Sequence, residues 1–400
     1  MTRALERLDD SKRDMPVNRT HPLRNGLPAD WARSIIDAAA FTAEQERFAH
    51  IWTFLGLVVD VAKEGDWIKA SLGLRSVFVQ RIRGELKGFE NRCAHRFYPL
   101  RTADKGNGPI VCGFHHWSYD GDGRALGIPM CVETFGVVAR GMNARLTPIE
   151  VAVCGTLIFG RFPSPEATGT LKDFLGAAFP IIAGLSRMTR RPRHFSLPIE
   201  AHWKLCMHVA IDDYHLSAIH PRTFGKIGYL SREHITYTRV GAHSVFQSTN
   251  AANTFSHLAS TIAEGTASSD HYVVLHLMPN VSFAQAYVGG GYYSCVLIQF
   301  VPESHKTSRQ RVWTFRSPLK RGRRGVPRLL QPFMDPFIAI LAKNAARCIL
   351  REDATAAERL QTNAAGFIGS PLIGALEERI VWFENAYRLI MADQLTETPL

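Results

Sequence analysis

The sequence predicts an α+β fold, with a small all-β domain followed by a larger domain in which helices lie on a sheet. Three observations support this fold class. Short β-rich runs separated by Gly and Asp turns occupy residues 58–162. Strand-like runs return between residues 271 and 316. Two long helical patterns follow, over residues 333–365 and 370–392, so the second domain combines a sheet with helices.

The composition is that of an ordinary globular protein. Of 400 residues, 46% are hydrophobic and 21% are charged, and a chain of this length usually forms two or three domains. The formal net charge of +11 favours acidic partners, although a merely basic enzyme is the simpler interpretation. No apolar run approaches the roughly 18 residues that a membrane span requires. We expect neither a membrane nor a nucleic acid as a partner.

Seven cysteines are scattered along the chain. An odd, dispersed set in a long chain argues against a disulfide framework and for a reducing compartment. Residues 1–18 lack the apolar segment of a secretory signal. We therefore expect a cytoplasmic protein.

The order of the elements divides the chain into three parts. Residues 1–47 begin as a polar, proline-containing lead-in and enter a helical pattern that covers residues 30–56. We expect this arm and helix to pack on the second domain. Residues 48–162 form the all-β domain. A linker-like stretch at 163–170 then opens the second domain, which comprises residues 163–400.

Two Cys/His pairs lie on loops of the all-β domain. Cys93 and His95 form C-x-H, and Cys112 and His115 form C-x2-H after sixteen intervening residues. Thiolates and imidazoles suit zinc and iron–sulfur clusters, but a zinc finger groups its cysteines together and its histidines together. One cysteine and one histidine per loop favour a Rieske [2Fe–2S] cluster, in which two cysteines bind one iron and two histidines the other. A zinc-binding structural module is the alternative, and it would be colourless.

These residues resemble a known family. Residues 91–96 and 112–129 are similar to the Rieske domain of the large subunit of Rieske non-haem iron ring-hydroxylating oxygenases. The resemblance extends over about residues 46–390. The family usually has Gly at two loop positions where this chain has Phe97 and His116. We expect these departures to affect packing rather than ligation.

A second metal site is predicted within residues 194–220, which start extended and then turn helical. His215 and His220 are five residues apart, so a helix that ends or bends near residues 217–218 would bring both imidazoles to one metal. Two imidazoles and one carboxylate form the facial triad of non-haem Fe(II) oxygenases. An H-x4-H pair is a weak signal alone, and it gains strength beside a Rieske motif.

The family resemblance includes this segment. The family's pattern N-W-K…D-x2-H-x4-H is matched from its Trp onward by Trp203, Lys204, Asp212, His215 and His220. The resemblance implies that Asp212 connects His215 to His115 of a neighbouring chain, with Asp213 as the alternative. A carboxylate between two metal-bound imidazoles would fix the orientation of both rings.

The third ligand is expected downstream, within residues 346–362. This segment resembles the family's E-D-x4-E-x2-Q pattern, in which the Asp ligates iron. The resemblance indicates Asp353, with Glu352 as the alternative. Helical spacing supports Asp353, because it interrupts an apolar stripe as a buried ligand would. That stripe consists of Ala346, Leu350, Ala357, Leu360 and Ala364.

The resemblance also implies fold, cofactors and activity. It implies a helix-grip (START-like) catalytic domain of antiparallel sheet and helices, a Rieske [2Fe–2S] cluster, and a mononuclear Fe(II) that uses O2. The chain would be the terminal oxygenase of a multicomponent system, and hydroxylation (cis-dihydroxylation) of an aromatic substrate is the first choice. Monooxygenation, or O- or N-demethylation, of an aromatic or small organic substrate is the enzymatic alternative. Electron transfer without oxygenation is the alternative of another class.

The expected partners follow from the same resemblance. The sequence has no flavin or NAD fingerprint, so electrons from NAD(P)H must arrive from a reductase, directly or through a ferredoxin. The family implies a head-to-tail homotrimer, with or without a small β subunit, because the two metal sites of one chain are too far apart for efficient electron transfer. Such a heterologous interface closes as a ring. Candidate residues for lining the substrate pocket are Met207, Phe224, Met278 and Phe283, although we expect most of them to belong to the core instead.

Overall fold

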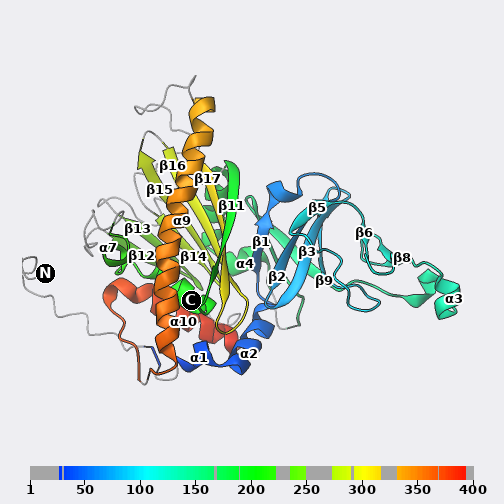
Figure 1. Ribbon diagram of the computed structural model, residues 1–400, viewed down its shortest axis with the longest axis horizontal. Coiled ribbons are helices and arrows are strands. Elements are labelled where there is room, and N and C mark those ends of the chain that lie inside the picture. Colours follow the sequence, from blue (N-terminus) through cyan, green and yellow to red (C-terminus); the bar gives the residue numbers. More distant parts are fainter. Residues whose placement is uncertain are drawn as a thin grey trace, which may run out of the picture.

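The computed structural model of the chain contains two lobes that lie side by side (Figure 1). A small β lobe comes first along the chain, and a larger sheet with the long helix α9 (Gln331–Ala364) forms the second. The predicted α+β class, with antiparallel sheets and helices, is confirmed. The structure describes residues 27–28, 31–165, 169–188, 190–221, 235–248, 273–289, 292–316, 331–367 and 369–392.

The small lobe is built on a seven-stranded antiparallel sheet in the order β1-β10-β9-β4-β3-β2-β5. A three-stranded sheet, β6-β7-β8, extends it outward. Apolar side chains of β2 and β3 form one core of this lobe together with side chains of β1, β9 and β10. The strands are β1 (Thr53–Leu57), β2 (Asp66–Leu72), β3 (Arg75–Ile82), β4 (Glu85–Glu90), β5 (Lys105–Asn107), β6 (Ile110–Val111), β7 (Ser118–Tyr119), β8 (Ala125–Gly127), β9 (Pro148–Cys154) and β10 (Leu157–Arg161).

One glycine fixes how the small lobe meets the N-terminal helices. Gly73 turns the chain between β2 and β3 with a φ of 55°. A Cβ at this position would collide with the backbone carbonyl oxygen of Gln45. Only glycine combines the left-handed backbone with such a close approach, so this turn depends on that residue.

The large lobe is a seven-stranded antiparallel sheet in the order β11-β17-β16-β15-β14-β13-β12. One face carries α6 (Trp203–Ile211), α9 and α10 (Glu378–Met391), whose apolar side chains share one core with the sheet. The other face packs against α4 (Leu171–Leu175), α5 (Ala178–Met188) and the small lobe. The strands are β11 (Arg190–Ile199), β12 (Ile235–Val240), β13 (His243–Ser248), β14 (Val273–Leu277), β15 (Val281–Gly289), β16 (Tyr292–Pro302) and β17 (Ser308–Arg316).

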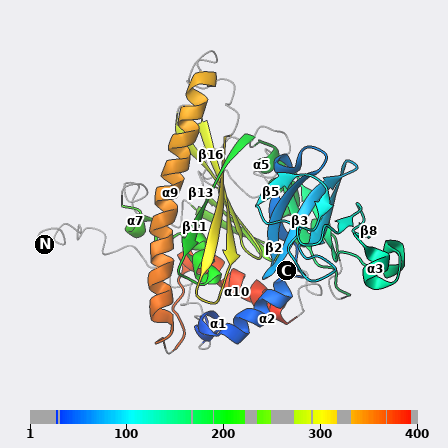
Figure 2. The same cartoon turned by 45° about the vertical axis from the view of Figure 1, so that its right-hand side comes forward.

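Short N-terminal helices pack on the large lobe (Figure 2). They are α1 (Arg33–Ile36) and α2 (Ala38–Phe48). Asp37 begins α2, because its carboxylate accepts hydrogen bonds from two backbone N–H groups of the first turn (2.8 and 3.3 Å). Phe48 at the end of α2 packs edge-on against Trp203 of α6, with ring centroids 5.4 Å apart. The arm that precedes these helices lies outside the described residues, and its position and the domain boundaries stay a prediction.

Two sequence-based boundaries are wrong. The helical pattern over residues 30–56 runs into β1, because that strand is buried along its whole length and its continuous apolar run has no period-two alternation. The pattern over residues 370–392 becomes helical only at residue 375, with a 3-10 turn before α10. The hairpin β12–β13 and helix α5 were not predicted. Within the described ranges, none of the helices combines the length and apolarity that crossing a membrane requires.

A buried carboxylate joins α10 to the N-terminal segment and to α6. Glu384 accepts a hydrogen bond from the indole N–H of Trp31 (2.9 Å). Its Oε1 also lies 2.8 Å from His208 Nε2 and 3.4 Å from the Lys204 ammonium. Burial alone would raise the pKa of Glu384, but Lys204, His208 and Trp31 outweigh burial and lower it to about 2. The carboxylate is therefore ionised and holds three elements together.

We expect Glu384→Gln to lower the free energy of unfolding by roughly 3–5 kcal/mol at neutral pH, because the Lys204 ammonium stays buried without its partner. The pKa of Glu384 is depressed in the folded chain. Its contribution is therefore present above the ordinary value of 4.5 and is lost as the pH falls towards 2. Thermal unfolding of both proteins between neutral and acid pH measures this. The matched control is Glu46→Gln on the exposed face of α2, which should change stability by less than about 0.5 kcal/mol. Equal effects of the two substitutions would contradict the account.

Candidate metal centres

The two Cys/His loops of the small lobe make the same turn. In each, the backbone N–H four residues after the cysteine donates to the cysteine carbonyl, at 3.1 Å for Cys93 and 3.0 Å for Cys112. The cysteine N–H donates to the carbonyl five residues after it, at 2.9 and 2.8 Å. Phe97 and His116, at the fourth position, have φ angles of 60° and 58°. The departures from glycine therefore affect the backbone conformation of the turns, at about 1–2 kcal/mol each. The expectation that they affect packing is wrong for Phe97, whose side chain is 74% exposed.

The four side chains of these loops are arranged with thiols inside and imidazoles outside. Cys93 and Cys112 are buried, His95 is half-buried and His115 is exposed. The two imidazole rings lie 4.8 Å apart, and Trp117 stacks on His95 at 4.8 Å with an interplanar angle of 6°. Burial and the neighbouring His115 lower the pKa of His95, so its imidazole is neutral, as a ligand must be. This arrangement fits a cluster with one cysteine-bound and one histidine-bound iron.

Tyr119 covers the thiol side of this site. Its hydroxyl lies 3.0 Å from Cys93 Sγ and accepts a hydrogen bond from the backbone N–H of Ala94 (3.1 Å). Burial raises the pKa of Tyr119, so the hydroxyl keeps its proton and can donate to a thiolate. Two backbone N–H groups also point to Cys112 and counteract the rise that burial gives its pKa. Hydrogen bonds to sulfur are one means by which a protein tunes an iron–sulfur site.

The second site begins where α6 ends. Asp212 stops the helix, because its Oδ1 accepts hydrogen bonds from the backbone N–H groups of Tyr214 (2.8 Å) and His215 (3.3 Å). A single helical turn, α7 (Leu216–Ile219), follows, with His215 before it and His220 after it. The predicted bend at residues 217–218 is wrong, since the break lies at residues 212–215. The Asx turn, in which the Asp212 side chain accepts from the backbone N–H groups that follow it, is the physical cause of this break.

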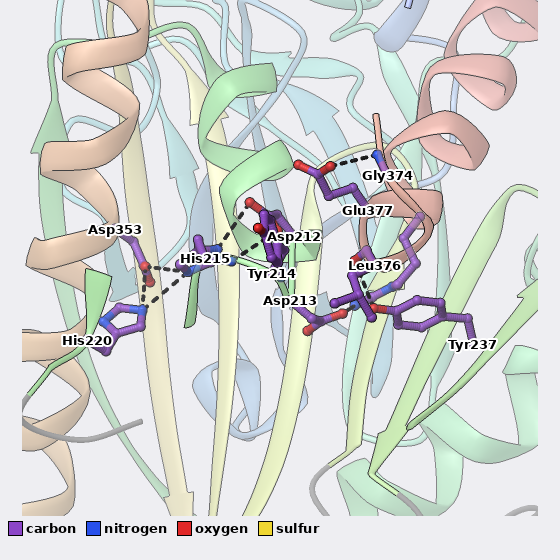
Figure 3. A network of polar contacts seen from close by, with 11 residues as sticks. Asp212, Asp213, Tyr214, His215, His220, Tyr237, Asp353, Gly374, Leu376 and Glu377 are labelled. Atoms are coloured by element: carbon purple, nitrogen blue, oxygen red, sulfur yellow. Dashed lines mark hydrogen bonds and ion pairs between the residues drawn. The ribbon is translucent and has the colours of Figure 1, made fainter. Parts of the chain in front are cut away.

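His215, His220 and Asp353 converge from α7 and α9 (Figure 3). The two Nε2 atoms lie 3.3 Å apart, and Asp353 Oδ1 lies 3.4 Å from His215 Nε2 and 2.9 Å from His220 Nε2. Asp353 Oδ1 is buried, yet no described residue gives it a hydrogen bond of good geometry. Two imidazole nitrogens and a carboxylate oxygen therefore point to one common position. This donor set fits the facial triad of a mononuclear Fe(II) site.

The charges of this site favour a cation at its centre. Burial would lower the pKa of His215, but the carboxylates of Asp212 and Asp353 outweigh burial and raise it to about 10. Asp353 and Glu352 raise the pKa of His220 in the same way. Both histidines in turn lower the pKa of Asp353 against the effect of burial. The carboxylates that stabilise two imidazolium rings would equally stabilise a divalent cation bound between neutral rings.

Each histidine of the triad is oriented by a carboxylate on its other nitrogen. His220 Nδ1 lies 2.8 Å from Glu352 Oε2, and His215 Nδ1 lies 3.4 Å from Asp212 Oδ2. His215 Nδ1 and Asp212 Oδ2 are close enough for an ion pair, but they do not have hydrogen-bond geometry. Glu352 thus stands behind His220 while Asp353 faces the common position. The arrangement gives the two neighbouring acids different roles, and sequence spacing alone did not indicate the contact of Glu352.

We expect Glu352→Gln to weaken Fe(II) binding about 10–100-fold, because the imidazole of His220 loses the carboxylate that fixes its tautomer and raises its basicity. Titration of iron-depleted protein with Fe(II) under anaerobic conditions measures the dissociation constant. Glu358→Gln on the same helix is the matched control. Its Oε1 accepts a hydrogen bond from the Glu200 backbone (3.3 Å), far from the histidines, and its Fe(II) affinity should equal that of the wild type. If Glu352→Gln binds Fe(II) as tightly as the wild type, Glu352 does not support His220 as a metal ligand.

The neighbouring acids Asp212 and Asp213 point in different directions. Asp213 is buried and lies 3.4 Å from the guanidinium of Arg379, which is itself fully buried on α10. Arg379 also donates to Ser244 Oγ (3.2 Å). The Asp212 side chain is 20% exposed and contacts His215. Asp213 therefore anchors the loop, and Asp212 is the more accessible of the two acids. No sequence signal identified Arg379 as the partner of Asp213.

One residue of the predicted apolar stripe is not placed as expected, whereas the described pocket candidates lie in the core, as was expected of most of them. Leu360 is 50% exposed, whereas the half-buried Gln361 beside it accepts a hydrogen bond from the backbone N–H of His202 (2.8 Å). The pocket-lining candidates Met207 and Met278 are buried in the core beneath the helices, whereas Phe283 is buried on the opposite face of the sheet. These three residues do not line one pocket. The fourth candidate, Phe224, lies outside the described residues.

The two candidate centres lie far apart within one chain. The loops around β6 and β7 are at one end of the long axis, and α7 is at the other end (Figure 1). The chain therefore brings together the four residues of the first site and the three of the second, but it does not bring the two sites to each other.

Two family models match the amino-acid sequence. Residues 185–393 match the model described as "Ring hydroxylating alpha subunit (catalytic domain)". Residues 51–140 match "Rieske [2Fe-2S] domain". Together the matches include all seven candidate ligands, although they do not test the role of any single residue.

Similar proteins are oxygenase subunits. The chain is 30% identical over 237 residues to the anthranilate 1,2-dioxygenase large subunit of Burkholderia cepacia, covering 54% of each chain. It is 28% identical over 196 residues to the glycine betaine monooxygenase oxygenase subunit of Chromohalobacter salexigens, covering 48% of this chain and 43% of the relative. The chain spans about half the length of the curated relatives it matches.

Solved structures share the fold over nearly the whole chain. A quaternary ammonium Rieske monooxygenase superposes with a TM-score of 0.69 at 17% identity, covering 92% of this chain and 95% of that one. Naphthalene 1,2-dioxygenase from Rhodococcus sp. superposes with a TM-score of 0.67 at 19% identity, covering 92% and 94%. At these identities the likeness extends to the fold alone.

Proposed function

The chain belongs to the ring-hydroxylating alpha-subunit family, and on this premise we propose that it is the terminal oxygenase of a multicomponent Rieske oxygenase. The Rieske and catalytic domains of this family imply a Rieske [2Fe–2S] cluster and a mononuclear iron. The observation that carries the proposal is the convergence of His215, His220 and Asp353 in a chain that also holds two Cys/His loops. A protein that only transferred electrons would not need this triad.

We assign each ligand from the geometry. Cys93 and Cys112 hold one iron of the cluster, and His95 and His115 hold the other. When bound, the cluster supplies electrons and the mononuclear iron supplies the activation of O2.

His215, His220 and Asp353 hold the mononuclear iron, and Glu352 and Asp212 fix the two imidazoles from behind. Tyr119 and Trp117 shield the cluster side, and Asp353 neutralises part of the charge at the iron side.

We infer that electron transfer from the cluster to the mononuclear iron takes place between two neighbouring chains. We propose a head-to-tail homotrimer in which Asp212 lies between His215 and His115 of a neighbouring chain. Two observations support this trimer. The two sites lie at opposite ends of the long axis of the folded molecule, and both His115 and Asp212 are accessible, Asp212 partly so. A heterologous interface that closes as a ring satisfies this geometry. Asp212 would then fix both imidazoles through one carboxylate.

We propose a reductase, directly or through a ferredoxin, as the electron donor, with NAD(P)H as the source, since the sequence has no nucleotide or flavin fingerprint of its own. Aromatic hydroxylation is the favoured reaction, because the relatives include an anthranilate 1,2-dioxygenase large subunit. Monooxygenation of a small organic substrate is the second candidate, because another relative is a glycine betaine monooxygenase subunit. None of the seven cysteines is in a disulfide, which favours the cytoplasm.

The test is NAD(P)H-dependent oxygenation by purified protein with a surrogate reductase and ferredoxin. We expect a coloured protein with a Rieske EPR signal that hydroxylates at least one member of a panel of aromatic acids. Glycine betaine in the same assay tests the second candidate. A colourless protein without the signal would overturn the whole proposal. A protein with the signal that consumes no O2 with any substrate would instead support electron transfer alone.

A further inference from the structure

A cleft of about 730 Å³ lies between the two lobes. One wall comes from β2 and its neighbours in the small lobe, and the other comes from β11, β16 and β17 of the large sheet. None of the candidate metal ligands is among the described residues that line it. The volume is within the range of about 300–1,000 Å³ that small-molecule sites occupy.

The cleft is on the face of the large sheet opposite the mononuclear site. Side chains alternate between the two faces of a strand. Val312 of β17 packs in the core with α6 and α9, the helix that carries Asp353. Its neighbour Trp313 packs against Phe54 of the small lobe, with ring centroids 5.2 Å apart, and Arg311 shares that face and lines the cleft. A ligand in the cleft is therefore separated from the triad by the sheet.

Among the described residues that line the cleft, one arginine has no acidic partner after the ion pairs are formed. Three acids of the cleft each have a basic partner, in the pairs Asp60–Lys105 (2.9 Å), Asp104–Lys69 (3.5 Å) and Glu303–Arg309 (2.6 Å).

Arg311 is the exception, because no carboxylate of the described residues lies within 4.0 Å of its guanidinium. It donates to the neutral amide of Gln299 (3.2 Å) and lies over the Trp313 ring at 4.9 Å. Burial lowers the pKa of Arg311, although Asp104 and Asp60, at longer range, oppose this. A guanidinium in such surroundings is suited to a bidentate carboxylate.

Two buried acceptors also line the cleft. Gln45 Oε1 and Asn280 Oδ1 have no hydrogen-bond donor among the described residues. Their amides are not reversed, because Gln45 Nε2 donates to Glu44 (2.7 Å) and Asn280 Nδ2 donates to the Phe300 carbonyl (3.0 Å). A buried acceptor without a donor costs about 1–3 kcal/mol, and neither oxygen is exposed to the cleft as it stands. A rotation of either amide towards a donor bound in the cleft would therefore be favoured.

We propose that this interlobe cleft is a second ligand site for a small organic carboxylate that carries a hydroxyl or amino group. The carboxylate binds the guanidinium of Arg311. A hydroxyl would donate to the amide oxygen of Asn280, and an amino group, which has more than one N–H, could also donate to that of Gln45. Because both lobes supply the walls, an occupied cleft stabilises their arrangement by mass action.

The test uses isothermal titration of the metal-loaded enzyme with L-malate as the probe. We expect saturable binding by the wild type, and binding at least tenfold weaker by Arg311→Gln. The matched control, Arg309→Gln, lies two residues away on the same strand face, but its cation is already paired with Glu303. Its affinity for malate should stay within twofold of the wild type. The Asp353→Ala variant should bind malate as the wild type does, since its iron site is on the other face.

A second set of measurements separates the two kinds of contact. Succinate, which keeps both carboxylates and lacks the hydroxyl, should bind more weakly than malate, and butan-2-ol, which keeps the hydroxyl and lacks both carboxylates, should not bind. Asn280→Ser should weaken malate binding and leave succinate binding unchanged, which tests the site even if Arg311→Gln does not fold. Absence of saturable malate binding would overturn the proposal, as would equal losses for Arg311→Gln and Arg309→Gln. The proposal would also be overturned if the wild type binds no carboxylate and Arg311→Gln has a different oligomeric mass. In that case a carboxylate of another copy of the chain would be the partner of Arg311.

Discussion

Replacing Asp353 with alanine is expected to abolish oxygenation and leave the Rieske centre intact. The substitution removes the one carboxylate oxygen at the point where His215 Nε2 and His220 Nε2 converge. Loss of an outer partner of a metal ligand typically costs 10–100-fold, so loss of the ligand itself should lower product formation by more than about a hundredfold. The small lobe does not contact α9 through this residue, and its thiols and imidazoles stay in place.

Metal analysis and EPR separate this result from simple misfolding. Asp353→Ala should contain about two iron atoms per chain in place of about three, with unchanged acid-labile sulfide and an unchanged Rieske signal. Glu358→Ala on the same helix is the matched control and should keep both the iron and the activity. Full iron content together with full activity in Asp353→Ala would show that another residue completes the site, and Glu352 would be the first to examine.

Asp212→Asn should lower turnover by about tenfold or more while both metal centres stay loaded. Asparagine has the shape of aspartate, so its side-chain oxygen can still accept from the backbone N–H groups of Tyr214 and His215. The loop therefore keeps its fold. The amide lacks the negative charge that holds the imidazole of His215 and, in the proposed trimer, that of His115 from a neighbouring chain.

The informative readout for Asp212→Asn is the rate at which the reduced Rieske signal is lost in the presence of O2 and substrate. That rate should fall with turnover, whereas iron content and the spectrum of the oxidised protein should not change. The exposed Asp122 supplies a control, Asp122→Asn, which should behave as the wild type. If Asp212→Asn loses iron, the residue only maintains the site, and its proposed place between two chains is wrong.

The metal motifs were predictable from sequence because their spacing is local. Cys93 and His95 share one turn, Cys112 and His115 share another, and His215 and His220 bracket α7. Ligands at short spacing are fixed by one loop, so residue type and interval are informative. Asp353 is more distant, and the resemblance together with one interrupted apolar stripe was enough to indicate it. The structure places it beside both histidines, although the stripe itself was misassigned at Leu360.

The features that sequence did not reveal depend on contacts between distant segments. The pairing of Asp213 with Arg379 joins residues 166 positions apart, and Glu384 meets Trp31 across 353 positions. Neither has a local pattern. Most of the strand β1 was read as helix, because its five buried residues show no alternation of buried and exposed positions. The cleft between the lobes likewise exists only once the two sheets are packed, as does the position of Arg311, which has no carboxylate partner within the described ranges.

The central claim is that the cluster of one chain serves the triad of another, and a mixed-oligomer experiment tests it most directly. Cys112→Ser removes a cluster ligand and His215→Ala removes a triad ligand, so each variant alone should be inactive. When the two variants are co-expressed with different affinity tags and the doubly tagged oligomers are purified, activity should return, because some neighbouring pairs then combine an intact cluster with an intact triad. Doubly tagged oligomers that form and stay inactive would contradict the account.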